Sequence, residues 1–223
     1  MGILSFMRTR RGKGSERSNV ARAGATKVAG LEVAGWHWAQ ALSTTEATLF
    51  RRGARAELSF LDDRTLARQL LDRKYRTWLA GQVLLPSRRG IVGLVALVSG
   101  SGTAADFSPE TFVPALLTYV ERPLRVLIAS GGKDDQLRDR LQSHAPWHEV
   151  IADPGLLQDG QAVDLVVVTK PRLEMSDRIR LSAIPASLVI FAGPRLTRLA
   201  EPEQVGGSRT APATVPAAKS KAA

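Results

Sequence analysis

Short, almost uninterrupted runs of apolar residues recur through the middle of this chain, and a stretch with helical periodicity follows most of them. The runs RVLIA (125–129) and LVVV (165–168) are typical. Strands of this kind are buried on both faces, and parallel strands need long connections such as helices. The pattern predicts an α/β fold, with a mainly parallel, Rossmann-like sheet covered by helices on both faces.

The expected elements follow from this alternation. We expect strands at 56–61, 82–86, 122–130, 148–152, 163–169 and 186–193, with helices between them. The strands within 122–130 and 163–169 should be neighbours or nearly so. The stretch 62–81 predicts one helix that buries a broad face made of Leu66, Leu70, Tyr75, Trp78 and Leu79. Asp62 or Asp63 is placed to cap its start and Gly81 to end it.

Composition limits what the domain can contain. The chain has 223 residues, 44% of them hydrophobic, which is enough for one domain with a real core. Cysteine is absent, so disulfides, thiolate metal sites and cysteine nucleophiles are excluded. No apolar run approaches the roughly 20 residues of a membrane helix, and we therefore expect a cytoplasmic protein.

Part of the net charge of +10 lies in the tails. Residues 1–28 form a basic arm and residues 201–223 an Ala/Pro-rich tail. Neither has apolar periodicity, so we predict two disordered tails around a single domain at 29–200. The arm can bind an anionic membrane surface, which would make the protein peripheral at the inner membrane face. The alternatives are a solvated tail and a true start at Met7, while a nucleic-acid partner would rest on charge alone.

Polar turns follow four of the expected strands. They are LDDR (61–64), PSRRG (86–90), SGGKDD (130–135) and TKPRLE (169–174). Ligands of open α/β sheets bind at the carboxyl ends of the strands. We therefore predict that these turns converge on one crevice.

The turn SGGKDD has features of a phosphate site. Gly131 and Gly132 allow the backbone to approach a ligand, the following helix N-terminus attracts an anion, and Lys133 adds a full charge. The alternative is a tight turn that needs positive φ. The motif matches neither of the common glycine-rich phosphate loops.

The turn TKPRLE presents charged groups at a strand end. Lys170 and Arg172 could hold a diphosphate, and Glu174 could accept hydrogen bonds from sugar hydroxyls, with Thr169 and Pro171 beside them. The alternative is a helix that starts at a proline and carries an acid in its first turn.

Other catalytic sets are not indicated. His144 and His148 are four residues apart, a spacing that suits metal ligands on a helix, but Pro146 between them spoils that geometry. No GxSxG motif supports a Ser-His-Asp site. We expect no metal site.

In order, four stretches resemble the bacterial WecB/TagA/CpsF glycosyltransferase family, whose members are N-acetylmannosaminyltransferases and relatives. These stretches are 31–50, 58–92, 112–152 and 163–194. The family acts in the synthesis of teichoic acid, enterobacterial common antigen and other cell-surface polysaccharides such as capsule and exopolysaccharide. The match is long and keeps the order and spacing, although its individual motifs are degenerate.

The resemblance implies an inverting enzyme that needs neither metal nor cofactor. It would transfer an N-acetylhexosamine-type sugar from a UDP-sugar to a polyprenyl-diphosphate-linked acceptor. Ser59 matches a threonine on the family's first long strand, and Asp62, or Asp63 if the alignment shifts by one residue, matches the asparagine that follows it. By this resemblance Asp62 and Glu174 would contact sugar or acceptor, while phosphates would be held by Arg88, Lys133, Lys170 and Arg172.

The departures from the family pattern bear on catalysis. Ser87 stands where the family carries an aspartate proposed as the general base, and Arg88 replaces the glycine after it. Leu173 replaces a glutamine. Serine is no base at neutral pH without an activating partner. Two hypotheses follow: an active glycosyltransferase, and a catalytically inactive relative that binds a nucleotide sugar or a partner in polysaccharide synthesis.

Overall fold

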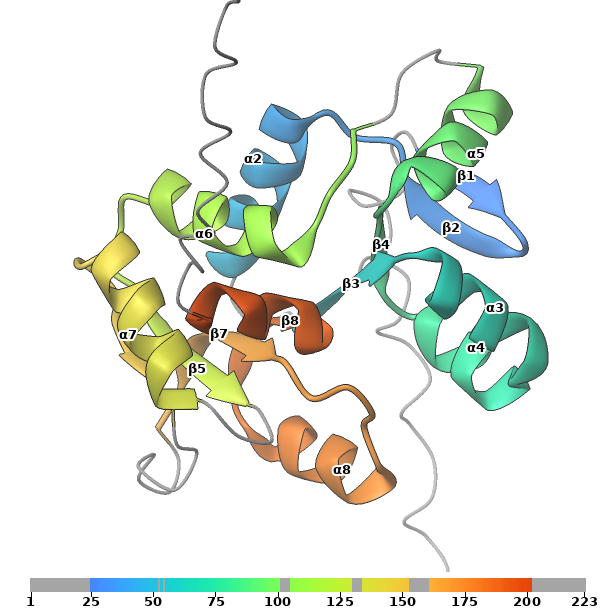
Figure 1. Cartoon of the computed structure of the whole chain (residues 1–223). Helices are drawn as coiled ribbons and strands as arrows, with labels where there is room; N and C mark the ends of the chain where they lie inside the picture. Colours follow the sequence, from blue (N-terminus) through green and yellow to red (C-terminus); the bar gives the residue numbers. More distant parts are fainter. Residues whose placement is uncertain are drawn as a thin grey trace, which may run out of the picture.

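The structure, a computed structural model, contains one eight-stranded sheet flanked by helices (Figure 1). It describes residues 25–51, 53, 55–100, 105–129, 134–152 and 161–201. The strands are β1 (Ala25–Val28), β2 (Leu31–Ala34), β3 (Ala56–Leu61), β4 (Val83–Pro86), β5 (Arg125–Ala129), β6 (Glu149–Ile151), β7 (Val163–Val168) and β8 (Ala186–Phe191). The helices are α2 (Trp38–Leu49), α3 (Asp63–Leu71), α4 (Arg73–Leu79), α5 (Arg89–Ser99), α6 (Pro109–Tyr119), α7 (Asp134–His144), α8 (Met175–Ala183) and the 3-10 helix η3 (Gly193–Ala200).

The strand order is β1-β2-β4-β3-β8-β7-β5-β6, and every pairing except that of β1 with β2 is parallel. The predicted α/β class with a mainly parallel, Rossmann-like sheet is confirmed. The predicted neighbours β5 and β7 pair directly, with Val126 opposite Leu165. The predicted start of the domain at residue 29 is too late, because β1 already pairs from Ala25 onward. The rest of the basic arm and the tail from residue 202 lie outside the described residues.

One face of the sheet is covered by a single continuous core. Helices α2, α6, α7 and η3 pack there against side chains from β3, β4, β5, β7 and β8. Its centre is aromatic: Phe112 contacts Phe60, Phe107 and Trp38 with ring centroids less than 6 Å apart. Phe107 and Phe112 are fully buried. This face therefore holds the larger part of the hydrophobic core.

The other face, here called the split face, has two separate hydrophobic clusters. Helices α4 and α5 cover one cluster, which includes Leu61, Leu79 and Leu84. Helix α8 covers the second, which includes Val166 and Val189. The boundary between the clusters falls between β3 and β8, the neighbouring strands at the centre of the sheet.

The single helix predicted over 62–81 is instead two helices, α3 and α4, that meet at Asp72. Asp72 has extended backbone angles and its carboxylate accepts a hydrogen bond from the Tyr75 N–H at 3.0 Å, so it caps α4. The predicted apolar face is therefore interrupted: Leu79 is buried, but Leu70 is 64% exposed. Asp62 caps α3 as expected, whereas the end comes at Leu79 rather than at Gly81.

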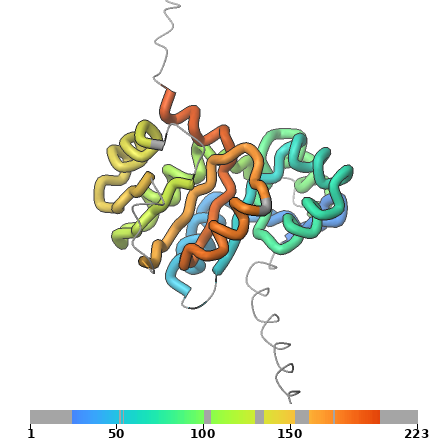
Figure 2. Tube along the Cα trace, turned by 90° about the horizontal axis from the view of Figure 1, so that it is seen from below, coloured from blue at the N-terminus to red at the C-terminus, as the bar shows by residue number. Residues whose placement is uncertain are grey.

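The chain leaves β3 and β8 toward opposite faces. After β3, α3 and α4 pack on the split face; after β8, η3 packs with α6 and α7 on the other face. Neighbouring parallel strands whose connections diverge in this way leave a crevice at their carboxyl ends. The α3–α4 pair and α7 lie at opposite ends of the domain in both views (Figure 2). Within the described residues, no helix combines the length and apolar character that crossing a membrane requires.

Candidate functional site

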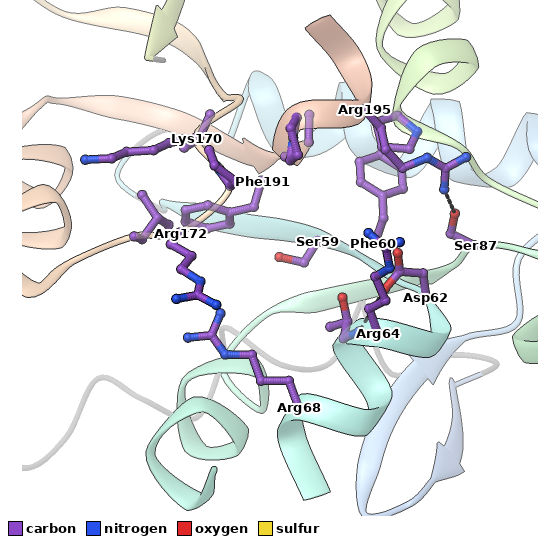
Figure 3. A pocket seen from close by; sticks show the side chains of 18 of the residues that line it. Ser59, Phe60, Asp62, Arg64, Arg68, Ser87, Lys170, Arg172, Phe191 and Arg195 are labelled. Atoms are coloured by element: carbon purple, nitrogen blue, oxygen red, sulfur yellow. Dashed lines mark hydrogen bonds between the residues drawn. The ribbon is translucent and has the colours of Figure 1, made fainter. Parts of the chain in front are cut away.

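A pocket of about 560 Å³ lies at the carboxyl edge of the sheet, over the boundary between β3 and β8 (Figure 3). Its walls come from the turns that follow β3, β4, β7 and β8. Asp62, Ser87, Lys170 and Arg172, which come from three turns of the sequence analysis, all line it. The predicted convergence is thus observed for these turns, while Gly131, Gly132 and Lys133 lie outside the described residues.

Positive charge dominates this pocket. Among the described residues that line it, eight are basic and one, Asp62, is acidic. The basic residues are Arg64, Arg68, Arg88, Lys170, Arg172, Arg178, Arg195 and Arg198. Such a concentration of like charge in a concave site raises the local potential and attracts anions.

Two of these cations are already committed to carboxylates. Lys170 Nζ bonds both oxygens of Asp177, at 2.8 and 2.9 Å, and points away from the other labelled side chains in Figure 3. Hydrogen bonding to Lys170, with a further bond from the Glu174 N–H, lowers the pKa of Asp177. Arg195 Nε bonds Glu110 at 3.0 Å. Neither charge is fully available to a ligand.

Other cations have no such partner. Within the described part of the chain, the side chains of Arg64, Arg88, Arg172 and Arg198 make no hydrogen bond or ion pair that the structure resolves. In Figure 3 the Arg172 and Arg68 side chains extend toward each other across the pocket. Two facing guanidinium groups repel each other unless an anion lies between them, so this wall is suited to an anionic ligand.

Aromatic rings orient the remaining two arginines. The Arg68 guanidinium lies 4.2 Å from the Tyr75 ring centroid, and that of Arg178 lies 4.6 Å from the Trp78 centroid. Trp78 also meets Phe191 edge-on, which links α4 to the strand β8. Arg178 Nε is buried without a hydrogen-bond partner among the described residues. Burial raises the pKa of the Tyr75 phenol, which therefore stays protonated at neutral pH.

The turn after β4 contains no group that can act as a catalytic base. Ser87 is 1% exposed, and its hydroxyl oxygen accepts a hydrogen bond from Arg195 Nη1 at 3.2 Å. A guanidinium cannot accept a proton, so Arg195 cannot activate this hydroxyl as a histidine would. Arg88 follows with φ of 76° and ψ of 147°, a backbone conformation almost restricted to glycine. Its N–H donates to Asp106 Oδ1 at 2.8 Å, which helps to hold the turn.

A polar network lies on the split face beside the boundary between its two clusters. Ser59 of β3, which also lines the pocket, donates a hydrogen bond to the Gln82 amide oxygen. The Gln82 amide nitrogen donates in turn to Glu57 at 3.3 Å. Ser59 and Gln82 are both buried. Asp62 directly follows the same strand, and one of its carboxylate oxygens accepts a hydrogen bond from the Thr65 N–H at 2.8 Å.

Two predicted site residues do not line the pocket. Thr169 is 2% exposed, and its hydroxyl has no partner among the described residues. Glu174 is exposed and forms a capping box with Asp177 at the start of α8. The alternative of the sequence analysis, a helix that starts at Pro171, is wrong, because α8 begins at Met175 and Glu174 is its N-cap residue. Pro171 and Ser59, by contrast, line the pocket.

Sequence reasoning missed several arginines of the pocket. Arg64 and Arg68 are four residues apart on α3, and Arg195 and Arg198 are three apart on η3. This spacing places each pair on one side of its helix. The spacing was visible in the sequence, but the direction of each helix relative to the crevice was not.

Comparisons with known proteins add no family assignment. A scan of protein-family models and a search of curated proteins both find no match to this chain.

Proposed function

We propose that the pocket binds the diphosphate of a nucleotide sugar, with a UDP-sugar as the ligand. The observation that carries the proposal is the charge of the lining, eight basic residues against Asp62 among the described residues. A diphosphate presents several oxygens to such a set, and guanidinium groups recognise phosphates in a bidentate manner. A volume of about 560 Å³ suits a small-molecule ligand.

The facing arginines give this proposal a specific geometry. Arg68 belongs to α3 and Arg172 to the turn after β7, so the two charges come from opposite walls of the crevice. A diphosphate between them would remove their mutual repulsion and join the walls. The pocket also lies at the sheet edge where α/β proteins bind ligands.

The resemblance to the WecB/TagA/CpsF family supplies the biological setting of the proposal. The chain would be a degenerate glycosyltransferase-like member that acts in bacterial cell-surface polysaccharide synthesis, peripheral at the inner membrane face. Ser87, bonded to Arg195, offers no base at the position where the family carries aspartate. The hypothesis that best fits the chemistry of Ser87 is a protein that binds the nucleotide sugar without turning it over.

A second candidate is sugar transfer with Asp62 as the base. Asp62 is the single acidic residue among the described residues of the lining, and one of its oxygens has no role in capping α3. A lipid-linked acceptor hydroxyl would have to reach that oxygen within hydrogen-bonding distance for proton transfer.

Calorimetry with UDP, UDP-N-acetylglucosamine and UDP-N-acetylmannosamine tests the binding proposal. Arg68→Ala and Arg172→Ala should each weaken binding by about tenfold to a hundredfold, since a hydrogen bond to a charged group contributes about 1.5–3 kcal/mol. Arg76→Ala is the matched control, because Arg76 is exposed on α4 and does not line the pocket. The proposal is wrong if the native chain binds none of these ligands, or if Arg76→Ala has the same effect.

Release of UDP in the presence of a lipid diphosphate acceptor separates the two candidates. We expect the native protein to be silent. We also expect Ser87→Asp to restore little, because the new carboxylate would pair with Arg195 and lose basicity. Turnover by the native chain, reduced about 10²–10⁴-fold by Asp62→Asn, would favour the transferase instead.

A further inference from the structure

Two leucines are exposed where α3 meets α4. Leu70 is 64% exposed and Leu71 is 90% exposed, at the last turn of α3. The break at Asp72 turns the chain, so that Leu79 and its neighbours on α4 reach the core while these two leucines do not. Their burial within the domain therefore contributes little to the stability of the fold.

Positive charges follow the leucines directly. Arg73 and Lys74 form the exposed start of α4, and the first turn of this helix holds no acidic residue. The carboxylate of the N-cap residue Asp72 precedes them and accepts a hydrogen bond from the Tyr75 N–H. Within the described residues, neither side chain makes an ion pair that the structure resolves. Two exposed cations beside two exposed leucines suit a partner that is both apolar and negatively charged.

We propose that Leu70, Leu71, Arg73 and Lys74, here called the leucine corner, dock on an anionic lipid surface. The leucines would enter the boundary between headgroups and acyl chains, and the two cations would lie among the phosphates. None of its four residues belongs to the basic arm at residues 1–28. It is also independent of the nucleotide-sugar proposal, because none of its four residues lines the pocket.

Charge distinguishes this partner from a second copy of the chain. A symmetric dimer formed through the leucine corner would bring Arg73 and Lys74 close to their own equivalents. Like charges at an interface disfavour association. An anionic bilayer instead provides apolar contact and negative charge together.

Vesicle sedimentation of the full-length protein tests the leucine corner. Vesicles of phosphatidylcholine with phosphatidylglycerol should bind the native chain, and vesicles of phosphatidylcholine alone should bind it much more weakly. Leu70→Gln with Leu71→Gln should lower the affinity at least about tenfold. Arg73→Gln with Lys74→Gln should lower it by about fivefold per charge, and should also reduce its dependence on salt.

Leu97→Gln is the matched control, because Leu97 is 79% exposed on a different helix, α5. It should bind like the native chain, and circular dichroism should show that all variants are folded. The proposal is overturned by absent binding, by leucine variants that bind normally, or by an equal loss in Leu97→Gln. Light scattering that shows a dimer broken by Leu71→Gln, with no vesicle binding, would assign the surface to self-association.

Discussion

The two faces of the sheet differ in how they are covered. One carries a continuous core under α2, α6, α7 and η3, with a cluster of aromatic rings around Phe112. The other carries two clusters with a polar contact, Ser59 to Gln82, near their boundary. The continuous face buries the larger part of the hydrophobic core. The split face leaves the carboxyl ends of β3 and β8 open, and there the basic pocket lies.

The difference shows how one sheet can provide both stability and a site. A gap in the hydrophobic covering costs burial, and the domain tolerates it because the opposite face is well packed. Charged side chains that would be unfavourable in a core can then converge over the gap. The comparison predicts that substitutions on the continuous face change stability, and that those around the boundary change binding more than stability.

The largest expected effect is that of Phe112→Ala. Phe112 is fully buried among three aromatic rings, so its truncation should lower the free energy of unfolding by about 3–5 kcal/mol. Phe191→Ala, on the split face, should lower it by about half as much, since Phe191 is only partly buried. Urea denaturation measures both. Equal losses would mean that the two faces are equally important for stability.

A smaller loss of stability is expected at the hydrogen bond between Ser59 and Gln82. Ser59→Ala should lower the free energy of unfolding by about 1–3 kcal/mol, because it leaves the buried Gln82 oxygen without its donor. Ser59→Ala combined with Gln82→Leu should recover part of this loss, since no unpaired polar group then remains at that contact. A double variant that is less stable than Ser59→Ala would show that the Gln82–Glu57 contact is the more important one.

Arg88→Gly should raise the free energy of unfolding, in contrast to the preceding substitutions. Arg88 has a φ of 76°, where glycine is unstrained, so the substitution should raise the free energy of unfolding by about 1 kcal/mol. It should at the same time weaken UDP-sugar binding, because Arg88 lines the pocket. Denaturation and calorimetry on the same sample test this trade-off. A variant that is both less stable and unchanged in affinity would contradict it.

The smallest expected effect is a pH dependence of stability that comes from His148, on the continuous face. His148 is buried; its Nδ1 accepts from the Leu124 N–H, and its Nε2–H donates to the Leu117 carbonyl oxygen. Burial lowers the pKa of His148 below 6.5, so the unfolded chain takes up the proton first as the pH falls. Its contribution to stability is therefore present above pH 6.5 and is lost as the pH falls toward the folded-state pKa.

Urea denaturation at about pH 7.5 and about pH 5.5 measures this loss. His148→Gln should reduce the difference in unfolding free energy between the two conditions, because glutamine does not titrate. Arg88→Gly, at the pocket, should leave the difference unchanged. A pH dependence that survives in His148→Gln would assign the proton to another group.

Much of the fold could be predicted because the apolar runs are local signals. The positions of β5 and β7 came from continuous apolar stretches, and the meeting of the polar turns after β3, β4 and β7 followed from the parallel sheet. The break at Asp72 could not be predicted from the spacing, since helical periodicity continues across a single extended residue. The pairing of Lys170 with Asp177 was hidden for a related reason: both are plausible ligand or capping groups until the turn geometry brings them together.

The amino-acid sequence by itself determined the α/β class, because strand and helix periods are properties of short segments. It also determined that polar turns follow the strands, since the polar residues after each apolar run can be seen in the sequence. Strand order was decided only by the tertiary structure, which places β8 beside β3 although they are far apart in the chain. The order depends on the packing of whole helices against a sheet, and no local pattern contains it. That order opened the crevice at β3 and β8 and turned scattered arginines from α3, α8 and η3 into one basic pocket.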